Sequence, residues 1–328
     1  MSKIISATSS WNARKFFFQW EWLLVVIFIA IHIINSLISP WYFNTGTFLT
    51  APMSFLDKAF IVLPMMLVII LGNIDISVAS IVALTSVLMA TIFNAGVPMA
   101  LAIVMALGIG TILGGINGLL LVKFKELPAM IITLATLTIY RGIAYVIMED
   151  RAAGGFPSWF SFFAWGHVGP FPFIMIVFAA AAVAFGILLH KTGFGRTIYG
   201  MGSNRTACVY SGVKTDRVLM IVGLLTGLMS AVCAIFLTSR MGSTRPNVAM
   251  GYELDVIAMV VLGGVSTSGG TGRIGGPLLA VFIIGFLNYG LGLINVSAQV
   301  LLIILGLLLV LSVLAMNLRS NKRVKKSA

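Results

Sequence analysis

The chain has 328 residues, of which 59% are hydrophobic and 9% are charged, and its mean hydropathy is +1.08. A soluble globular domain carries about 25% charged residues, so this composition excludes a water-soluble globular protein. The net charge of +12 does not indicate a nucleic-acid-binding protein, because the basic residues lie between and beyond apolar runs and not on one amphipathic face.

Long apolar runs follow one another along the chain. A helix needs about 20 apolar residues to cross the hydrocarbon core, and its backbone hydrogen bonds close within the run. Strands of a membrane barrel would instead alternate polar and apolar residues. The sequence therefore predicts an all-α, polytopic membrane protein with about ten transmembrane helices, which lie near 22–39, 55–71, 76–93, 97–121, 128–148, 170–190, 218–238, 254–268, 274–294 and 297–316.

The basic residues predict the orientation of these helices. If the N-terminus lies inside, sixteen of the 21 Lys and Arg residues fall on the cytoplasmic side, in agreement with the positive-inside rule. Both termini are then cytoplasmic, with an N-terminal segment over 1–21, a transmembrane domain over 22–316 and a basic tail over 317–328. The basic, polar segment 191–217 is placed in the cytoplasm, and the aromatic segment 149–169 on the outer face.

The third and eighth predicted spans are short, and both begin close to an acidic residue. Five spans separate them, so they cross the membrane in opposite directions. Inverted repeats with a pathway at the midplane are typical of transporters, so we interpret the pair as part of a 5+5 inverted repeat, with chance similarity between apolar runs as the alternative. The matching stretches are Asp75-Ile76-Ser77-Val78-Ala79-Ser80-Ile81-Val82 and Asp255-Val256-Ile257-Ala258-Met259-Val260-Val261-Leu262.

Asp75 lies between two spans, in the stretch Leu71–Ser77. A carboxylate near membrane depth costs several kcal/mol, so it normally faces a protein interior or water. We predict that Asn73, Asp75 and Ser77 line or brace a translocation pathway. The alternative is a helix N-cap, in which the side chain of Asp75 or Ser77 accepts from backbone amides. The two interpretations are compatible, because a broken helix needs such a cap.

Three charged residues are placed toward the outer side. Glu253 and Asp255 enter the eighth span from that side, where an outer-rim docking site and a helix N-terminus, which favours acidic residues, both fit. Arg141 lies near the outer end of the fifth span, where it either reaches the lipid headgroups or pairs with an acidic residue.

A glycine-rich run over 263–276 joins the eighth and ninth spans. Gly270, Gly272 and Gly275 satisfy G-x-G-x-x-G, but that motif indicates dinucleotide binding only between a strand and a helix. We therefore interpret the run as a tight turn with close backbone approach. The sequence has no G-x-x-x-x-G-K-[ST] motif, metal cluster or catalytic triad, so we expect a protein that is not an enzyme and uses no metal or cofactor.

Four further stretches carry a family resemblance: Asn73–Ser86, Lys191–Gly212, Gly251–Asp255 running into Val261–Gly264, and Gly285–Leu291. They resemble the permease subunits of the ribose-type, or second carbohydrate uptake, ABC importers, in collinear order over roughly residues 55–315. Within that family, the stretches 162–165 and 238–246 look most like rhamnose-type permeases, and the autoinducer-2 permeases are close relatives.

The resemblance implies a set of partners in the bacterial inner membrane. These are the lipid bilayer, a second permease subunit, identical or paralogous, a cytoplasmic ATPase that hydrolyses ATP, and a periplasmic sugar-binding protein; nucleic acid is not among them. The loop 191–217 would carry the coupling helix that docks into the ATPase. The resemblance places Gly195, Arg196, Asn204, Arg205 and Gly212 in that loop and adds Asn288 to the residues that line or brace the pathway.

Arg205 departs from the family pattern. Members often read Gly-x-Asn-Glu-Ala-Ala where this sequence reads Gly202-Ser203-Asn204-Arg205-Thr206-Ala207. The local charge is therefore reversed, and we hypothesise a matching acidic site on the ATPase of this importer.

These features together predict the membrane-spanning permease of an ATP-driven importer for a monosaccharide or related small polyol, with a rhamnose-like sugar as the first expectation. The alternative is an ion-coupled secondary transporter, which would need intramembrane ionisable residues as a relay. Asp75 and His32 are the residues that support this alternative.

Overall fold

In the computed structural model, residues 20–149 and 151–297 are described, together with isolated positions between 299 and 314. Residues 1–19 of the predicted N-terminal segment, the whole tail 317–328 and much of the predicted tenth span 297–316 lie outside the described residues.

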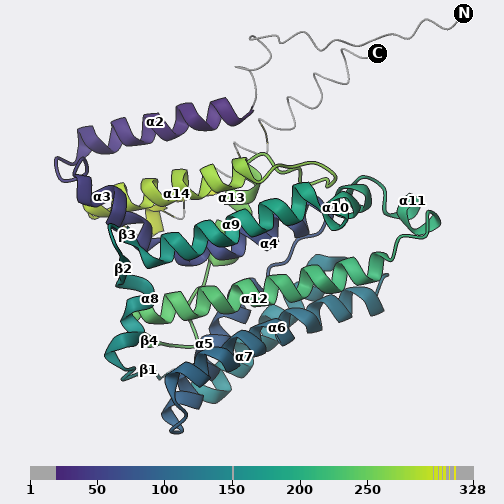
Figure 1. The fold of residues 1–328 in the computed structure, drawn as a ribbon, viewed down its shortest axis with the longest axis horizontal. Helices are drawn as coiled ribbons and strands as arrows, with labels where there is room; N and C mark the ends of the chain where they lie inside the picture. Colours follow the sequence, from purple (N-terminus) through teal and green to yellow (C-terminus); the bar gives the residue numbers. More distant parts are fainter. Residues whose placement is uncertain are drawn as a thin grey trace, which may run out of the picture.

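The described chain is mainly helical, and its long helices lie side by side along one direction (Figure 1). In chain order, the elements are α2 (Trp20–Ile38), α3 (Thr45–Thr50), η1 (Ala51–Ser54), α4 (Leu56–Ile70), α5 (Val78–Asn94), α6 (Met99–Lys123), α7 (Ala129–Met148), β1 (Ala153–Gly154), η2 (Ser158–Ser161), α8 (Phe162–Trp165), β2 (His167–Val168), β3 (Phe171–Pro172), α9 (Phe173–Lys191), α10 (Gly193–Ser203), α11 (Arg205–Tyr210), α12 (Thr215–Met241), β4 (Ser243–Thr244), α13 (Tyr252–Leu262) and α14 (Gly275–Leu293).

The length and composition of these helices confirm a multi-span membrane protein. Among the described residues, six helices (α2, α6, α7, α9, α12 and α14) are long and apolar enough to cross a membrane, and the bent pair of residues 46–54 with α4 raises the number to seven. Helix α13 has only 11 residues, which cover about 16 Å, roughly half of the hydrocarbon core. It ends at Leu262, before the predicted limit of 268, because Gly263 and Gly264 begin a turn in which Gly264 has a φ of +86°.

The two ends of the helix bundle differ. One end, named here the β end, carries α3, α8 and the antiparallel pairs β1–β4 and β2–β3, and the opposite end, named the α10 end, carries α10 and α11 (Figure 1). Phe93, at the last turn of α5, contacts Phe156 between β1 and η2 with 5.6 Å between ring centroids. Leu262, at the last turn of α13, instead accepts from Trp20 at the start of α2. The two short helices therefore run in opposite directions.

Helix α4 forms the centre of the bundle. All 15 of its residues are buried, and it packs against α9, α12 and α13. Phe60 stacks on Phe236 of α12 with 5.1 Å between ring centroids and meets Phe178 of α9 edge-on at 5.6 Å. The outer helices α2, α6, α7 and α9 instead keep large apolar side chains exposed, as expected for surfaces that face lipid.

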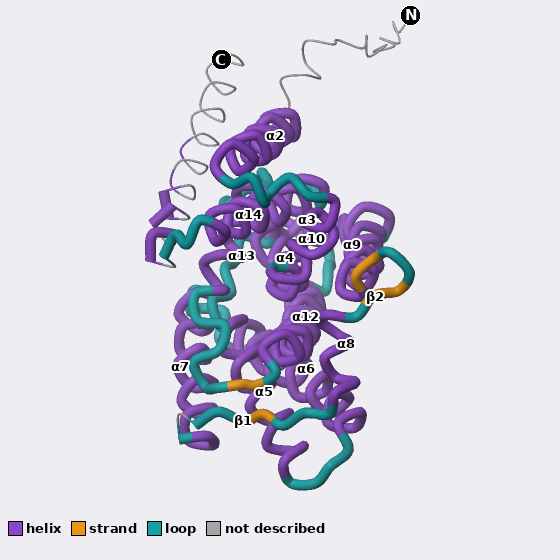
Figure 2. Tube along the Cα trace, turned by 90° about the vertical axis from the view of Figure 1, so that its left-hand side faces the viewer, coloured by secondary structure: helices purple, strands orange, loops and turns teal. Residues whose placement is uncertain are grey.

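Helix α12 lies between α4 on one side and α6 on the other (Figure 2). Its contact with α6 is made through glycines, since a Cβ added to Gly114 would lie only 2.6 Å from Cα of Gly227. Small residues at such positions let two membrane helices pack backbone against backbone.

Candidate functional site

Asp75 lies in the extended segment between α4 and α5, where it is buried in a hydrogen-bonded cluster. Its Oδ1 accepts from the backbone N of Ser77 at 2.9 Å and from the Ser77 hydroxyl at 2.6 Å. Asn117 of α6 donates to Ser77 Oγ at 2.6 Å, and the Tyr140 hydroxyl of α7 lies 3.3 Å from Asn117 Oδ1. These four residues, named here the Asp75 cluster, join the helix break to α6 and α7.

The capping interpretation of this segment is half right. Asp75 does accept from a backbone amide, that of Ser77. Ser77 itself occupies the N-cap position of α5, but its side chain makes no capping hydrogen bond and instead donates to Asp75. Asp75 therefore fixes the turn that precedes the helix.

A small cavity adjoins the Asp75 cluster. It is lined by Asn73, Asp75, Asn117 and Thr133 together with apolar side chains, and its volume is about 20 Å³. A space of this size holds one water molecule. Asn288 lines no part of it and lies on α14, where its Oδ1 is buried without a hydrogen-bond partner among the described residues.

Two adjacent residues of α4 form ion pairs with two different helices at the β end. Lys58 binds the carboxylate of Asp255 on α13, and their side chains are 10% and 11% exposed. Asp57 Oδ2 lies 2.9 Å from Arg240 Nη2 of α12 and accepts from the Tyr252 hydroxyl at 3.2 Å. We name these five residues the charge network. The charge network joins α4, α12 and α13. The Asp255 carboxylate is therefore paired inside the protein and does not lie at an outer surface.

Arg141 of α7 holds the segment that precedes α13. Its Nη1 donates to the backbone carbonyls of Pro246 at 2.6 Å and Val248 at 2.8 Å. Glu253, at the first turn of α13, is half-buried, and its Oε2 has no hydrogen-bond partner among the described residues. Among the described residues, Arg141 thus bonds to backbone carbonyls and forms no direct ion pair.

Sequence reasoning did not select Asp57, Lys58, Arg240 or Tyr252 as site residues. One signal was present, because Asp57 and Lys58 place two opposite charges side by side within a predicted span. Charged residues inside membrane segments usually pair with one another, so each of these two required a partner elsewhere in the chain.

The segment 191–217 folds into two short capped helices at the α10 end. Thr192 accepts from Gly195 N at 3.2 Å, and Asn204 accepts from Ala207 N at 2.9 Å, so these side chains begin α10 and α11. Gly195 packs against the Leu189 backbone, and Gly212 turns the chain with a φ of +78°. The residues of this segment that remain exposed include Arg196, Arg205, Val209 and Tyr210.

Glycines from three segments meet at the α10 end. Gly270 N donates to the carbonyl of Ile70, the last residue of α4, at 2.8 Å. A Cβ on Gly269 would lie 2.8 Å from the Gly202 carbonyl oxygen and 3.1 Å from Gly72 Cα. We name Gly72, Gly202, Gly269 and Gly270 the glycine junction. It confirms the close backbone approach predicted for the glycine-rich run.

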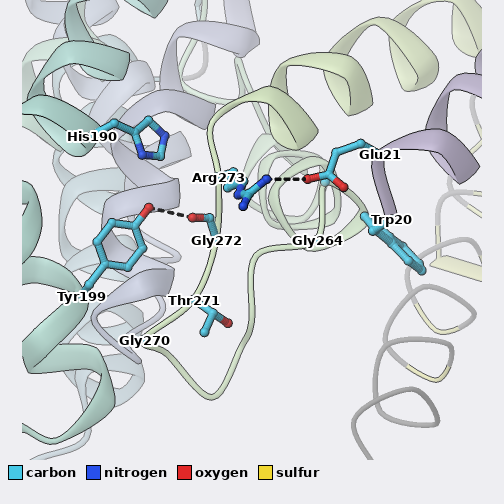
Figure 3. Close-up of a pocket in the computed structure, with 10 residues that line it drawn as sticks. Trp20, Glu21, His190, Tyr199, Gly264, Gly270, Thr271, Gly272 and Arg273 are labelled. Carbon is cyan, nitrogen blue, oxygen red and sulfur yellow. Dashed lines mark hydrogen bonds and ion pairs between the residues drawn. The ribbon is translucent and has the colours of Figure 1, made fainter. Parts of the chain in front are cut away.

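A pocket of about 700 Å³ opens beside this junction (Figure 3). The Tyr199 hydroxyl of α10 donates to the Gly272 carbonyl at 2.6 Å, and Arg273 lies 3.8 Å from Glu21 of α2. Burial raises the pKa of Tyr199, and the positive charge of Arg273 opposes part of that rise, so the hydroxyl stays protonated and keeps its hydrogen bond. The pocket therefore lies where α2, α10 and the glycine-rich run converge.

Comparisons with known proteins place the sequence in a family of permease components. The family model described as branched-chain amino acid transport system / permease component matches residues 49–313. The ribose import permease protein RbsC of Bacillus subtilis (strain 168) is 41% identical over 290 residues, which are 88% of this chain and 89% of that protein. RbsC of Haemophilus influenzae is 36% identical over 323 residues, 97% of this chain and 98% of that protein.

A third relative belongs to a different transport system. The autoinducer 2 import system permease protein LsrD of Escherichia coli (strain SMS-3-5 / SECEC) is 33% identical over 312 residues, 93% of this chain and 94% of that protein. No solved structure matches the chain. The chain therefore belongs to this family of permease components, as a non-catalytic, multi-pass membrane subunit of a bacterial ABC importer.

Proposed function

We propose that this chain forms the pathway by which an importer takes up a monosaccharide of the ribose or autoinducer-2 type. The observation that carries the proposal is the 41% identity to a ribose import permease over 88% of the chain. The family description names branched-chain amino acids, but all three relatives described above are named for ribose or autoinducer 2. A rhamnose-like sugar is the finer proposal, from the resemblance of 162–165 and 238–246 to rhamnose-type permeases.

The Asp75 cluster and Asn73 line and brace this pathway. The support is a buried carboxylate at a helix break, next to a cavity of about 20 Å³. Because a sugar does not fit into the space of one water molecule, the pathway is closed at this level. Transport then requires the walls of the cavity, which α6, α7 and α12 provide, to move apart. Asn288 braces α14 outside the cavity.

The α10 end faces the cytoplasm and the β end faces the periplasm. The basic segment 191–217 supports this orientation through the positive-inside rule. In this orientation both termini are cytoplasmic, with an N-terminal segment over 1–21, a transmembrane domain over 22–316 and a basic tail over 317–328. The opposite directions of α5 and α13 support ten spans in a 5+5 inverted repeat.

The partners bind at these two ends. The ATPase docks on α10 and α11, whose exposed side chains include Arg196, Arg205 and Tyr210. The sugar-binding protein docks at the β end, where Arg141 holds the segment before α13 and Glu253 lies at the first turn of α13. A second permease subunit completes the membrane part.

The family membership argues against the alternative of an ion-coupled secondary transporter. Uptake by an ABC importer is driven by ATP hydrolysis on partner chains, so the pathway needs no proton relay. His32 is accordingly assigned a packing role, since its Nδ1 is bonded to the Tyr42 hydroxyl at 2.6 Å.

The test is uptake by the chain reconstituted with its ATPase and binding protein in proteoliposomes. We expect ATP-dependent uptake of ribose or rhamnose and none of leucine. In cells, uptake should stop on ATP depletion and survive a protonophore. Leucine uptake, or uptake that a protonophore abolishes while ATP is intact, would contradict the proposal.

A further inference from the structure

A third cavity lies at the β end, between the end of α12, the segment 242–251 and the start of α13. Its volume is about 350 Å³, within the range of small-molecule sites. It shares no lining residue with the cavity beside Asp75, so it is a separate site on the side from which an imported solute would arrive.

The lining of this cavity is amphipathic. Its apolar lining residues include Leu237, Val248 and Met250, and its polar lining residues are Arg240, Ser243, Thr244, Arg245, Asn247 and Tyr252. None of the described lining residues is acidic. The charge of Arg240 is paired with Asp57 outside the cavity, and the exposed Arg245 forms no ion pair with a described residue. A sugar has the same division, because hydroxyls surround the edge of its ring while the ring face presents C–H groups. A small anion would pair with Arg245, but it would make no use of the apolar lining residues.

Three anchors hold the segment 242–251 in place before any ligand binds. Strand β4 pairs with β1. The Thr244 hydroxyl lies 2.8 Å from the Ser86 hydroxyl of α5. Arg141 of α7 donates to the Pro246 and Val248 carbonyls. A wall fixed from three directions loses little conformational entropy when it binds a ligand.

Two further features mark the cavity. Ala249 in its wall has a φ of +59°, which is the left-handed region that residues with a Cβ rarely adopt, and such strain gathers where a binding surface must be held in one shape. The guanidinium of Arg240 in its lining also has a buried Nε that bonds to no described residue.

We propose that this cavity binds one neutral monosaccharide and is the entry site of the pathway within the permease itself. The sugar hydroxyls bond to the polar lining residues Ser243, Arg245 and Asn247, and the ring face packs on the apolar lining residues. The class of substrate rests on the proposed function. The site adds a selectivity step to the permease, apart from recognition by the binding protein.

A binding experiment decides the entry site. The assembled importer, without its binding protein, is studied by saturation-transfer difference NMR with ribose and with rhamnose. Asn247→Ala removes an exposed amide from the rim, and Asn94→Ala removes another exposed amide at the β end of α5, outside the cavity. We expect one sugar to bind the wild-type complex, Asn94→Ala to bind it equally, and Asn247→Ala to bind it about five- to tenfold more weakly, the effect of one lost hydrogen bond. Equal binding by all three complexes, no binding of either sugar, or displacement of the sugar by inorganic phosphate would each overturn the proposal.

Uptake measured on the same complexes separates this inference from the proposed function. If the wild-type complex imports neither sugar but binds one of them, and Asn247→Ala weakens that binding, the result supports the entry site and contradicts the proposed function. If the wild-type complex imports a sugar and Asn247→Ala changes neither binding nor uptake, the result contradicts the entry site and supports the proposed function.

Discussion

Gly202 of α10 packs directly against the backbone of Gly270 in the turn between α13 and α14. A Cβ on Gly202 would lie 2.5 Å from Gly270 N and 3.0 Å from Gly270 Cα, and the same amide of Gly270 donates to the Ile70 carbonyl at the end of α4. At Gly202, helix α10 therefore contacts the end of the central buried helix and the 263–276 turn through backbone atoms. A displacement of α10 has no flexible side chain at this point to absorb it.

We first predict that Gly202→Ala uncouples transport from ATP hydrolysis. The added methyl group must push α10 away from Gly270 and Ile70, because backbone atoms cannot yield as a side-chain tip does. Gly193→Ala is the matched control on the same helix, since the nearest atom to its Cβ is the flexible Arg196 Nη2 at 3.7 Å. The measurement is uptake together with the ratio of stimulated to basal ATPase activity. Assembled Gly202→Ala complex with wild-type values of both would contradict the prediction.

The second prediction concerns the buried ion pair of Lys58 and Asp255. Asp255→Asn leaves the Lys58 charge without its partner and should lower the free energy of unfolding by about 3–5 kcal/mol. The double variant Lys58→Met/Asp255→Leu should recover most of that loss, because it removes both buried charges. Thermal unfolding of the purified complex measures both effects. Asp216→Asn, which breaks the exposed pair with Lys125, is the control and should change stability by less than about 1 kcal/mol. A double variant no more stable than Asp255→Asn would argue against the account.

The third prediction ranks variants of the Asp75 cluster. Asp75→Ala leaves the amide and the hydroxyl of Ser77 without their buried acceptor and should cost about 2–4 kcal/mol, whereas Asp75→Asn keeps one acceptor oxygen and should cost about 1 kcal/mol. Tyr140→Phe loses the hydroxyl that donates to the Leu113 carbonyl at 3.0 Å and lies 3.3 Å from Asn117 Oδ1, and it should cost about 1–2 kcal/mol. Denaturation of the three variants measures the free energy of unfolding of each. Equal losses for Asp75→Ala and Asp75→Asn would show that the hydrogen bonds from Ser77 to Asp75 do not contribute to stability.

The fourth prediction tests the reversed charge in the segment 191–217. Arg205 is exposed at the first turn of α11, so Arg205→Glu leaves the fold of the permease intact. We expect it to weaken assembly with an ATPase that carries a matching acidic site, and to reduce uptake about tenfold or more, the effect of placing two like charges in contact. Arg151→Glu is the control, because Arg151 is an exposed arginine at the β end. Unchanged assembly and uptake of the Arg205 variant would exclude the acidic site.

The local parts of the fold followed from the sequence, and the long-range parts did not. The apolar runs predicted the long helices, and the unusual shortness of α5 and α13 was visible as weak spans that begin near Asp75 and Asp255. The expectation for Asp255 at an outer rim did not include its partner Lys58, which lies 197 positions away. Asn288 was grouped with Asp75 by resemblance, and the structure places it on a helix that does not line the same cavity.

The sequence by itself determined that this protein is a bundle of membrane helices without a nucleotide-binding loop, because the length and apolarity of each run decide whether a segment crosses a bilayer, whatever its neighbours are. Only the tertiary structure decided which charges are paired, where the glycines of α10 and the 263–276 turn meet, and that a sugar-sized cavity is present beside Arg240. Burial and pairing depend on contacts between segments far apart in the chain, and no local pattern specifies which segments pack together.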